Sequence, residues 1–239
     1  MFNVMSAIRS SAPGGGGGSI PVTDQLLGQW DAAIGITDDG TISAWADQSG
    51  NGNDWTRLSA NGPILQSAVL NGLDVVEFPT ANARAMSQAQ IISSGAGEMV
   101  MVCRRLRTDN QGAPFSTTDI GGNGTHFMFG NALYDAIGSS TRFENISHGG
   151  RFDLNEWGIY GASKLAGAGD AALYGNDTTL VSGGRAEEWS TPWYLGRYWT
   201  ADGVWNGQIA EMAFWGKVLS GPERTSVFDY LNTKFGLGL

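Results

Sequence analysis

The sequence has few of the residues from which disulfides, metal centres and membrane spans are built. Among its 239 residues it has one cysteine, Cys103, and two histidines, His126 and His148. One cysteine cannot form an internal disulfide, and neither histidine has a partner at the spacing of a Cys/His metal site. No apolar run approaches the ~20 residues of a membrane helix, and the N-terminus lacks the basic start and apolar core of a signal peptide. We therefore expect no membrane insertion and no export by the usual secretory route.

Positive charge is also scarce. The chain has 14 Lys and Arg against 23 Asp and Glu, which gives a net charge of −9 and a pI near 4.6. Nucleic-acid binding needs clustered basic side chains, so the composition excludes nucleic acid as a partner. Glycine is abundant, with 36 residues, while charged residues are only 15% of the chain. This composition favours turns and strands over surface helices.

The clearest structural signals lie near the C-terminus. Residues 208–215 are almost all apolar, which is typical of a strand packed on both faces. Ser220 and Glu223 form a capping-box pattern, and Gly236 is a typical stop signal. The apolar face of the helix between them consists of residues four apart: Val227, Leu231 and Phe235. A helix of this length is unstable alone in water, so we expect it to dock on the body of the protein.

Further strand signals recur along the chain and are separated by turn residues. They lie at 40–47, 73–78, 99–106, 125–129, 155–163, 171–174, 179–181 and 193–197. Cys103 falls in the apolar stretch 99–106, which predicts a buried, unreactive thiol. No sequence repeat and no strong internal helix interrupts this pattern. We predict an all-β fold, a two-sheet antiparallel jelly-roll sandwich with a short C-terminal helix.

The first twenty residues differ from the rest. Residues 14–19 are five glycines and a serine, which by composition form a flexible tether. Four apolar residues precede it: Phe2, Val4, Met5 and Ile8. These side chains would bury well against another protein, so residues 1–20 are interpreted as an anchoring arm, the alternative being a disordered tail. Residues 21–239 are predicted to form one domain.

Three segments occur together in a characteristic order. They are WADQSGNGN at 45–53, NGLDVVEF at 71–78, and GQIAE at 207–211 followed by YLNTKFG at 230–236. With these segments the chain resembles the concanavalin A-like lectin/glucanase superfamily, specifically its LamG-like jelly-roll domains, over about residues 24–237. The resemblance implies two antiparallel sheets, one of them concave, with a ligand or partner across the concave face or its rim loops. Such domains occur in adhesins, in modules appended to glycosidases and in structural proteins of tailed bacteriophages.

The loop 47–54 contains no apolar residue. Calcium prefers hard oxygen ligands, and relatives of this fold sometimes hold calcium in a rim loop. The candidate ligands are Asp47, Asn51, Asn53 and Asp54. The alternative is a loop whose Asp and Asn side chains bond to the local backbone and support the fold. No other cofactor is predicted.

Catalytic signals are missing. Most glycoside hydrolases need two carboxylates that face each other across the substrate. The Glu-x-Asp-x-x-Glu pattern of the glucanase relatives does not occur, and Glu211 stands alone in the closing strand. Glu187 and Glu188 are adjacent, so they point to opposite faces of an extended chain. We therefore expect no enzyme activity.

Aromatic residues crowd the stretch 189–205. Aromatic rings that stack on sugar faces are a common means of holding carbohydrate, although most rings in a sandwich serve packing. The segment 197–203 is predicted to be a loop between two strands. Its candidate carbohydrate-binding residues are Arg197, Tyr198, Trp199 and Asp202.

These features suggest a bacteriophage virion surface protein: a head fibre, a capsid decoration protein or a tail adhesin. It would fold in the host cytoplasm, join other virion proteins through residues 1–20 and display a lectin-type jelly roll to host glycans. Several copies on the particle, as a homo-oligomer, would give weak sugar sites avidity for host attachment. The alternatives are a carbohydrate-binding module of a bacterial cell surface and, less favoured, a glycosidase or polysaccharide lyase.

Overall fold

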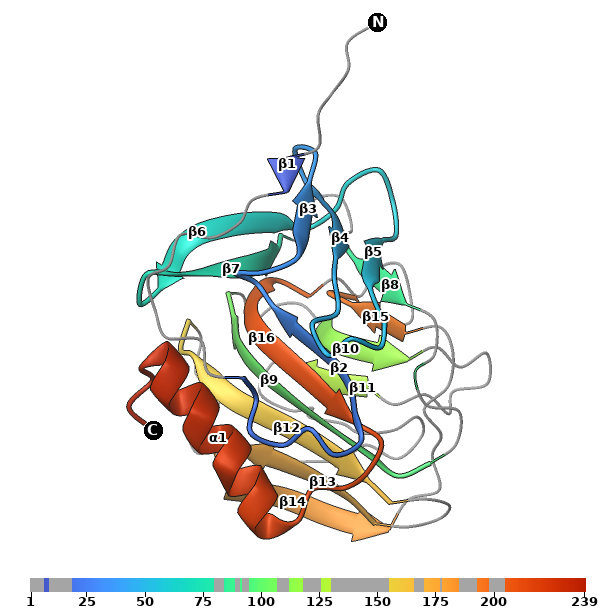
Figure 1. Cartoon of the computed structure of the whole chain (residues 1–239), viewed down its shortest axis with the longest axis vertical. Coiled ribbons are helices and arrows are strands. Elements are labelled where there is room, and N and C mark those ends of the chain that lie inside the picture. The colour runs from blue at the N-terminus through green and yellow to red at the C-terminus, as the bar shows by residue number, and fades with distance from the viewer. Residues whose placement is uncertain are drawn as a thin grey trace, which may run out of the picture.

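The computed structural model describes most of the chain. The described residues form two antiparallel sheets and one helix (Figure 1). The described residues are 7–8, 19–79, 84–88, 91, 95–106, 112–117, 126–129, 155–165, 170–176, 178–184, 193–197 and 205–239. This architecture confirms the predicted two-sheet β fold with a short C-terminal helix.

Within the described residues, each of the two sheets has eight strands. Sheet A has the spatial order β1 (Ala7–Ile8), β3 (Ile36–Asp38), β4 (Ile42–Trp45), β5 (Trp55–Arg57), β8 (Met86–Gln88), β15 (Trp193–Leu195), β10 (Gly112–Thr117) and β11 (His126–Phe129). Sheet B has the order β14 (Thr178–Gly184), β13 (Asp170–Gly175), β12 (Gly158–Lys164), β9 (Gly97–Arg105), β16 (Gly207–Trp215), β7 (Leu73–Phe78) and β6 (Ile64–Leu70). The remaining strand of sheet B, β2 (Leu26–Asp31), pairs with β16.

Strand β16 is the centre of sheet B. It pairs with β9 along its whole length, while its other edge pairs with β7 through residues 207–209 and with β2 through residues 211–215. All nine of its residues are buried. The continuous apolar run in the sequence therefore predicted the central strand correctly, because both faces of this strand are covered.

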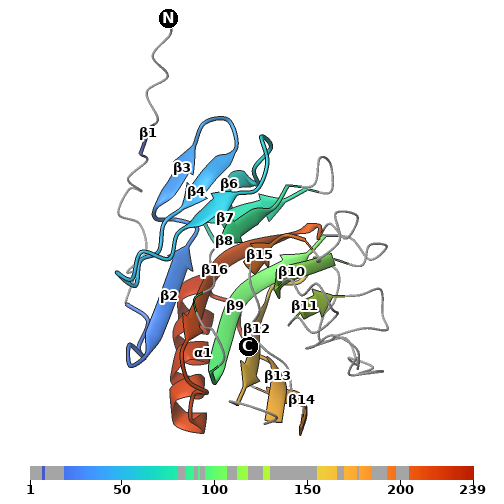
Figure 2. The same ribbon diagram turned by 90° about the vertical axis from the view of Figure 1, so that its right-hand side faces the viewer.

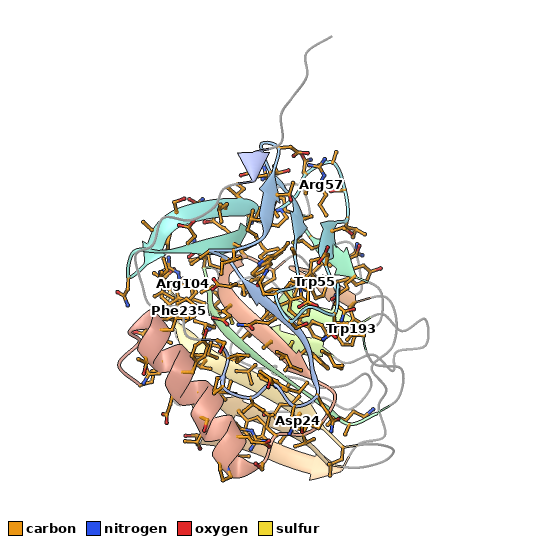
Figure 3. All side chains as sticks on the ribbon, in the orientation of Figure 1. Asp24, Trp55, Arg57, Arg104, Trp193 and Phe235 are labelled. Carbon is orange, nitrogen blue, oxygen red and sulfur yellow. The ribbon has the colours of Figure 1, made fainter. Side chains whose placement is uncertain are left out.

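One hydrophobic core lies between the two sheets and is rich in tryptophan. Its tryptophans are Trp30, Trp45, Trp55, Trp193 and Trp205. Trp45 and Trp55 are paired across β4 and β5, and the Trp193 ring centroid lies 4.8 Å from that of Phe214. Figure 3 labels Trp55 and Trp193. Cys103 belongs to the same core, where burial raises the pKa of its thiol well above the usual value. The predicted burial of this thiol is confirmed, and its raised pKa disfavours the reactive thiolate form.

A second core lies between the outer face of sheet B and helix α1 (Gly221–Phe235). In Figure 2 the helix lies on one side of β9 and β16, and β10 and β11 lie on the other. The predicted apolar face of the helix is buried there. Glu223 accepts the Ser220 backbone N–H at 2.9 Å, and Gly236 takes the left-handed conformation with φ 59°. The predicted start and stop of the helix are both confirmed.

Glu98 of β9 is the first of two carboxylates buried beneath α1. It is 0% exposed. Arg224 of the helix donates to it through Nε at 2.6 Å and Nη2 at 2.8 Å, and the Leu219 backbone N–H donates at 2.9 Å. Burial raises the pKa of Glu98, and the bonds from Arg224 oppose that shift. The Arg224 guanidinium also lies 3.9 Å from the ring centroid of Tyr174, so it is held on two sides.

Glu211 of β16 is the second buried carboxylate, also 0% exposed. Lys234 of the helix donates to it at 2.6 Å and to Asp31 at 2.5 Å, while Gln29 donates to it at 2.7 Å. Burial raises the pKa of Glu211, and the charge of Lys234 opposes that shift. Burial alone would lower the pKa of Lys234, but the two carboxylates outweigh it and raise the pKa. Glu211 is the one carboxylate on β16, and its partners come from β2 and α1.

A β-bulge explains why Glu211 faces the helix. The register of β16 against β9 shifts between Ile209, which pairs with Cys103, and Glu211, which pairs with Val102. Strict alternation would place Glu211 on the same face as Ile209, in the apolar core between the sheets. The extra residue in the bulge turns the carboxylate toward Lys234 instead.

Breaking the Glu98 pair tests whether these charges fix the helix. Arg224→Met leaves a buried carboxylate without its cation, so we expect the free energy of unfolding to fall by about 3–5 kcal/mol in urea titrations. The double variant Glu98→Gln/Arg224→Met has no charge at either residue, so it should recover much of the lost free energy of unfolding. The control is Lys217→Met, which removes a more exposed pair with Asp24 and Glu223 at the same end of the helix. A loss for Arg224→Met no larger than that of the control would contradict the argument.

Candidate functional site

The outer face of sheet A carries a row of mostly small polar side chains. The large side chains of its strands, such as Trp45, Trp55 and Trp193, point into the core between the sheets, so the alternate positions point outward. Cross-strand register joins these positions in one line from β3 to β10. We call this line the outer row; it consists of Thr37, Ala44, Thr56, Ser87, Tyr194 and Ser116.

The middle of the outer row has no large side chain. Ala44 and Ser87 are partly exposed and Thr56 is exposed, and the Thr56 hydroxyl donates to the Ser87 carbonyl at 3.3 Å. A hydroxyl is both a donor and an acceptor, as are the hydroxyls of a sugar. This part of the sheet can therefore receive a flat, polyhydroxylated ligand close to its backbone.

An arginine and a tyrosine stand together at one end of the outer row. The Arg197 guanidinium carbon lies 4.7 Å from the ring centroid of Tyr194. The carbonyl of Arg197 accepts the hydroxyl of Ser116 at 2.7 Å, and Ser116 is buried. The guanidinium thus lies over the ring of Tyr194, whose position in β15 pairs with Ser87 of β8.

The structure describes one of the four predicted carbohydrate-binding residues, Arg197. Tyr198, Trp199 and Asp202 lie outside the described residues. Tyr194 was not among the predicted residues. Alternation could have indicated it, because its neighbours Trp193 and Leu195 both face the core. For the described tryptophans of the crowded stretch, Trp193 and Trp205, the packing interpretation is correct.

The carboxylate of Asp47 is the centre of the predicted calcium loop. It accepts the backbone N–H groups of Gln29 at 2.9 Å, Ser49 at 2.8 Å and Asn53 at 3.1 Å, and the Ser49 hydroxyl at 2.8 Å. The N–H and O–H donors stabilise the negative charge on both carboxylate oxygens. A bound cation would stabilise the same charge. The arrangement of Asp47 therefore does not fit a calcium ligand.

The other three candidate ligands tie the loop to strand β2 and to itself. The side-chain amide of Asn51 donates to the Leu26 carbonyl at 2.9 Å, and that of Asn53 donates to the Leu27 carbonyl at 2.6 Å. Asp54 accepts the Asp47 backbone N–H at 2.9 Å. These contacts match the self-bonded loop, the alternative that the sequence analysis left open. Across the ranges that the structure describes, no three His, Cys, Asp or Glu side chains gather for a metal.

The carboxylates that share Lys234 are not arranged for catalysis. Asp31 and Glu211 both bind its ammonium group, and Glu211 is fully buried beneath the helix. A substrate could not reach this pair without displacement of α1. The absence of enzyme activity stays a prediction.

Part of the N-terminal arm pairs with the domain itself. Ala7 and Ile8 form β1 beside β3, with Ile8 opposite Thr37. The other predicted anchoring residues, Phe2, Val4 and Met5, lie outside the described residues. Within the described part of the chain, no helix is long and apolar enough to cross a membrane.

Comparisons with known proteins find likeness in structure only. No model of a protein family matches this sequence, and a search of curated proteins found no matching relative. Among solved structures, the binding domain of Paraclostridial Mosquitocidal Protein 1 superposes with TM-score 0.64 at 11% identity, over 88% of this chain and 53% of that one. Domain 4 of an extracellular GH43 arabinanase from Geobacillus stearothermophilus, in complex with arabinotriose, has TM-score 0.64 at 15% identity, over 86% and 98%.

A third similar structure is that of botulinum neurotoxin type C, whose cell entry depends on interaction with two ganglioside molecules. It has TM-score 0.62 at 13% identity, over 87% of this chain and 52% of that one. The chain thus spans about half the length of the two toxin structures and nearly all of the arabinanase domain. At these identities the likeness shows a shared β-sandwich fold.

Asp47→Ala tests the role of the loop. It leaves several backbone N–H groups without an acceptor, so we expect the free energy of unfolding to fall by about 2 kcal/mol, with or without EGTA. The control, Asp38→Ala, removes an exposed carboxylate that accepts one backbone N–H, from Gly40, and should change little. A calcium site would instead make the stability of the unmodified protein depend on the chelator, and that result would overturn our interpretation.

Proposed function

We propose that this protein binds glycans on the outer face of sheet A. The observation that carries the proposal is the outer row, where small hydroxyl side chains end at the Arg197 guanidinium over Tyr194. Sugar ligands need such a mixture of directional hydrogen-bonding groups and flat surfaces. The arabinotriose and ganglioside partners of similar folds are consistent with it.

The parts of the outer row have different tasks in this proposal. Arg197 donates to ring or hydroxyl oxygens, and Thr56 and Ser87 exchange hydrogen bonds with sugar hydroxyls. Tyr198 and Trp199 follow Arg197 directly in the sequence, and with Asp202 they would complete the site at this end. Their rings would stack on sugar faces.

We also propose that binding occurs without catalysis. Two features support this. The glucanase carboxylate pattern is missing from the sequence, and the buried pair of carboxylates Asp31 and Glu211 is bound to Lys234 beneath the helix. A glycosidase or polysaccharide lyase is the less favoured alternative. A carbohydrate-binding module of a bacterial cell surface is the other.

The biological setting that we propose is the surface of a bacteriophage particle. The support is the composition of residues 1–20, an apolar head joined to the domain by a glycine tether. The residues that we propose to contact other virion proteins are Phe2, Val4, Met5 and Ile8, of which Ile8 lies in β1. Several copies on one particle would bind host glycans by avidity.

The glycan proposal is tested on a glycan array, followed by calorimetry with the best ligand. Tyr194→Ala and Arg197→Ala should each weaken binding about tenfold, as truncation of a central contact residue does. The control is Arg57→Ala, which removes another partly exposed arginine of sheet A, one paired with Asp39. New reducing ends released from the bound glycan would contradict binding without catalysis. A blank array would contradict glycan binding itself.

The virion proposal is tested by copurification with phage particles. The full chain should sediment with assembled particles, and a variant that lacks residues 2–19 should remain in the supernatant. A triple variant, Phe2→Ser/Val4→Ser/Met5→Ser, retains the β1 residues and the tether and should also be lost from particles. Unchanged incorporation of both variants would rule out the arm as the anchor.

A further inference from the structure

A second line of polar side chains crosses the outer face of sheet B. Gln208 of β16 pairs with Glu77 of β7 on one side and with Arg104 of β9 on the other. Trp157 comes immediately before β12, whose Gly158 pairs with Cys103, the neighbour of Arg104. We call these four residues the polar row. Figure 3 labels Arg104, which lies near the C-terminal end of β9.

Hydrogen bonds link the polar row, and they run from donor to acceptor in one direction, from Arg104 to Glu77. Arg104 donates through Nε to the Gln208 side-chain oxygen at 2.7 Å, and the Gln208 amide donates to Glu77 Oε2 at 2.7 Å. Gln208 is buried, so water does not compete for these two bonds. The Arg104 guanidinium carbon also lies 4.8 Å from the Trp157 ring centroid. The guanidinium is therefore held at one edge and along one face.

The polar row keeps hydrogen-bonding capacity at both ends. Among the described residues, the Nη edge of Arg104 has one long contact, 3.5 Å from Nη1 to the Asn155 carbonyl. Glu77 uses Oε2 for Gln208, and Oε1 has no bond to the part of the chain that the structure describes. Arg104, Glu77 and Trp157 are all partly exposed. A ligand would thus meet a charged donor at one end and a charged acceptor at the other.

The Arg104 end and the Glu77 end of the polar row are complementary to different chemical groups of a ligand. A fixed, planar guanidinium edge matches a carboxylate through two parallel hydrogen bonds. Glu77 accepts only, and it repels a second negative group, so its complement is a hydroxyl donor. Neighbouring strands lie about 4.8 Å apart, so the two ends are roughly 10 Å apart at the backbone, and long side chains shorten that gap.

We propose that the polar row binds an acidic sugar, with the sugar carboxylate on Arg104 and a sugar hydroxyl on Glu77. Trp157 would contribute apolar surface for the C–H groups of the ring. An acidic peptide fits less well, since an Asp or Glu side chain offers no hydroxyl to Glu77. This site lies on the sheet opposite to the outer row and goes beyond the function proposed for sheet A.

The experiment is a titration of the full chain with glucuronate, followed by the ¹H–¹⁵N signal of the Trp157 indole. The indole signal that disappears in the Trp157→Phe variant is assigned to Trp157. We expect a saturable shift with glucuronate and none with glucose at the same concentration. Arg104→Gln should weaken glucuronate binding about tenfold or more, because it removes a charged hydrogen-bond donor. Arg104→Lys keeps the charge without the planar fork and should also weaken it.

Controls separate this site from sheet A. Tyr194→Ala should bind glucuronate at the polar row as well as the unmodified protein does, whatever the result on the glycan array. Acetate and the peptide Gly-Glu-Gly are the comparison ligands. Acetate binding as tight as glucuronate would reduce the site to a plain anion site, and tighter peptide binding would indicate a protein partner. Either result, or no glucuronate shift in the unmodified protein, would overturn the proposal.

Discussion

Two buried carboxylates and the helix cations that neutralise them hold this structure together. Glu98 and Glu211 stand on the central strands β9 and β16, and both are fully buried because α1 covers them. An unpaired ion in such a position costs several kcal/mol, so the helix must lie where Arg224 and Lys234 reach both groups. Apolar contacts attach the helix to the sheet, and the two ion pairs determine where along the sheet it lies.

Helix α1 covers one part of the outer face of sheet B, and the polar row crosses another part of that face. On sheet A, the tryptophan core between the sheets influences which side chains face outward. Large rings fill the space between the sheets, and the side chains at the outward positions of β4, β5 and β8 are small. One exposed face is consequently lined by hydroxyls, with Arg197 over Tyr194 at its end, and the other has a charged donor and a charged acceptor joined by Gln208. The faces suit ligands of different charge.

Much of the fold could be predicted from local sequence patterns. Most of the residues that meet in the two candidate sites could not. The strand 208–215, the helix with its caps and the buried Cys103 followed from periodicity and capping residues that act within a few positions. The partners of Glu211 and the meeting of Arg104 with Gln208 involve residues far apart in the sequence. A bulge in β16 also puts Glu211 on the face opposite to the one that strict alternation would give, which no short-range rule would show.

By itself, the sequence determined the identity of the elements: apolar runs, turns and caps specify strands and a helix through interactions between near neighbours. It also supplied the polar loop, whose Asp and Asn side chains bond locally and to β2. Only the tertiary structure decided which side chains meet on each sheet face. Cross-strand register depends on how whole sheets pack, and a shift of one residue moves a side chain to the opposite face.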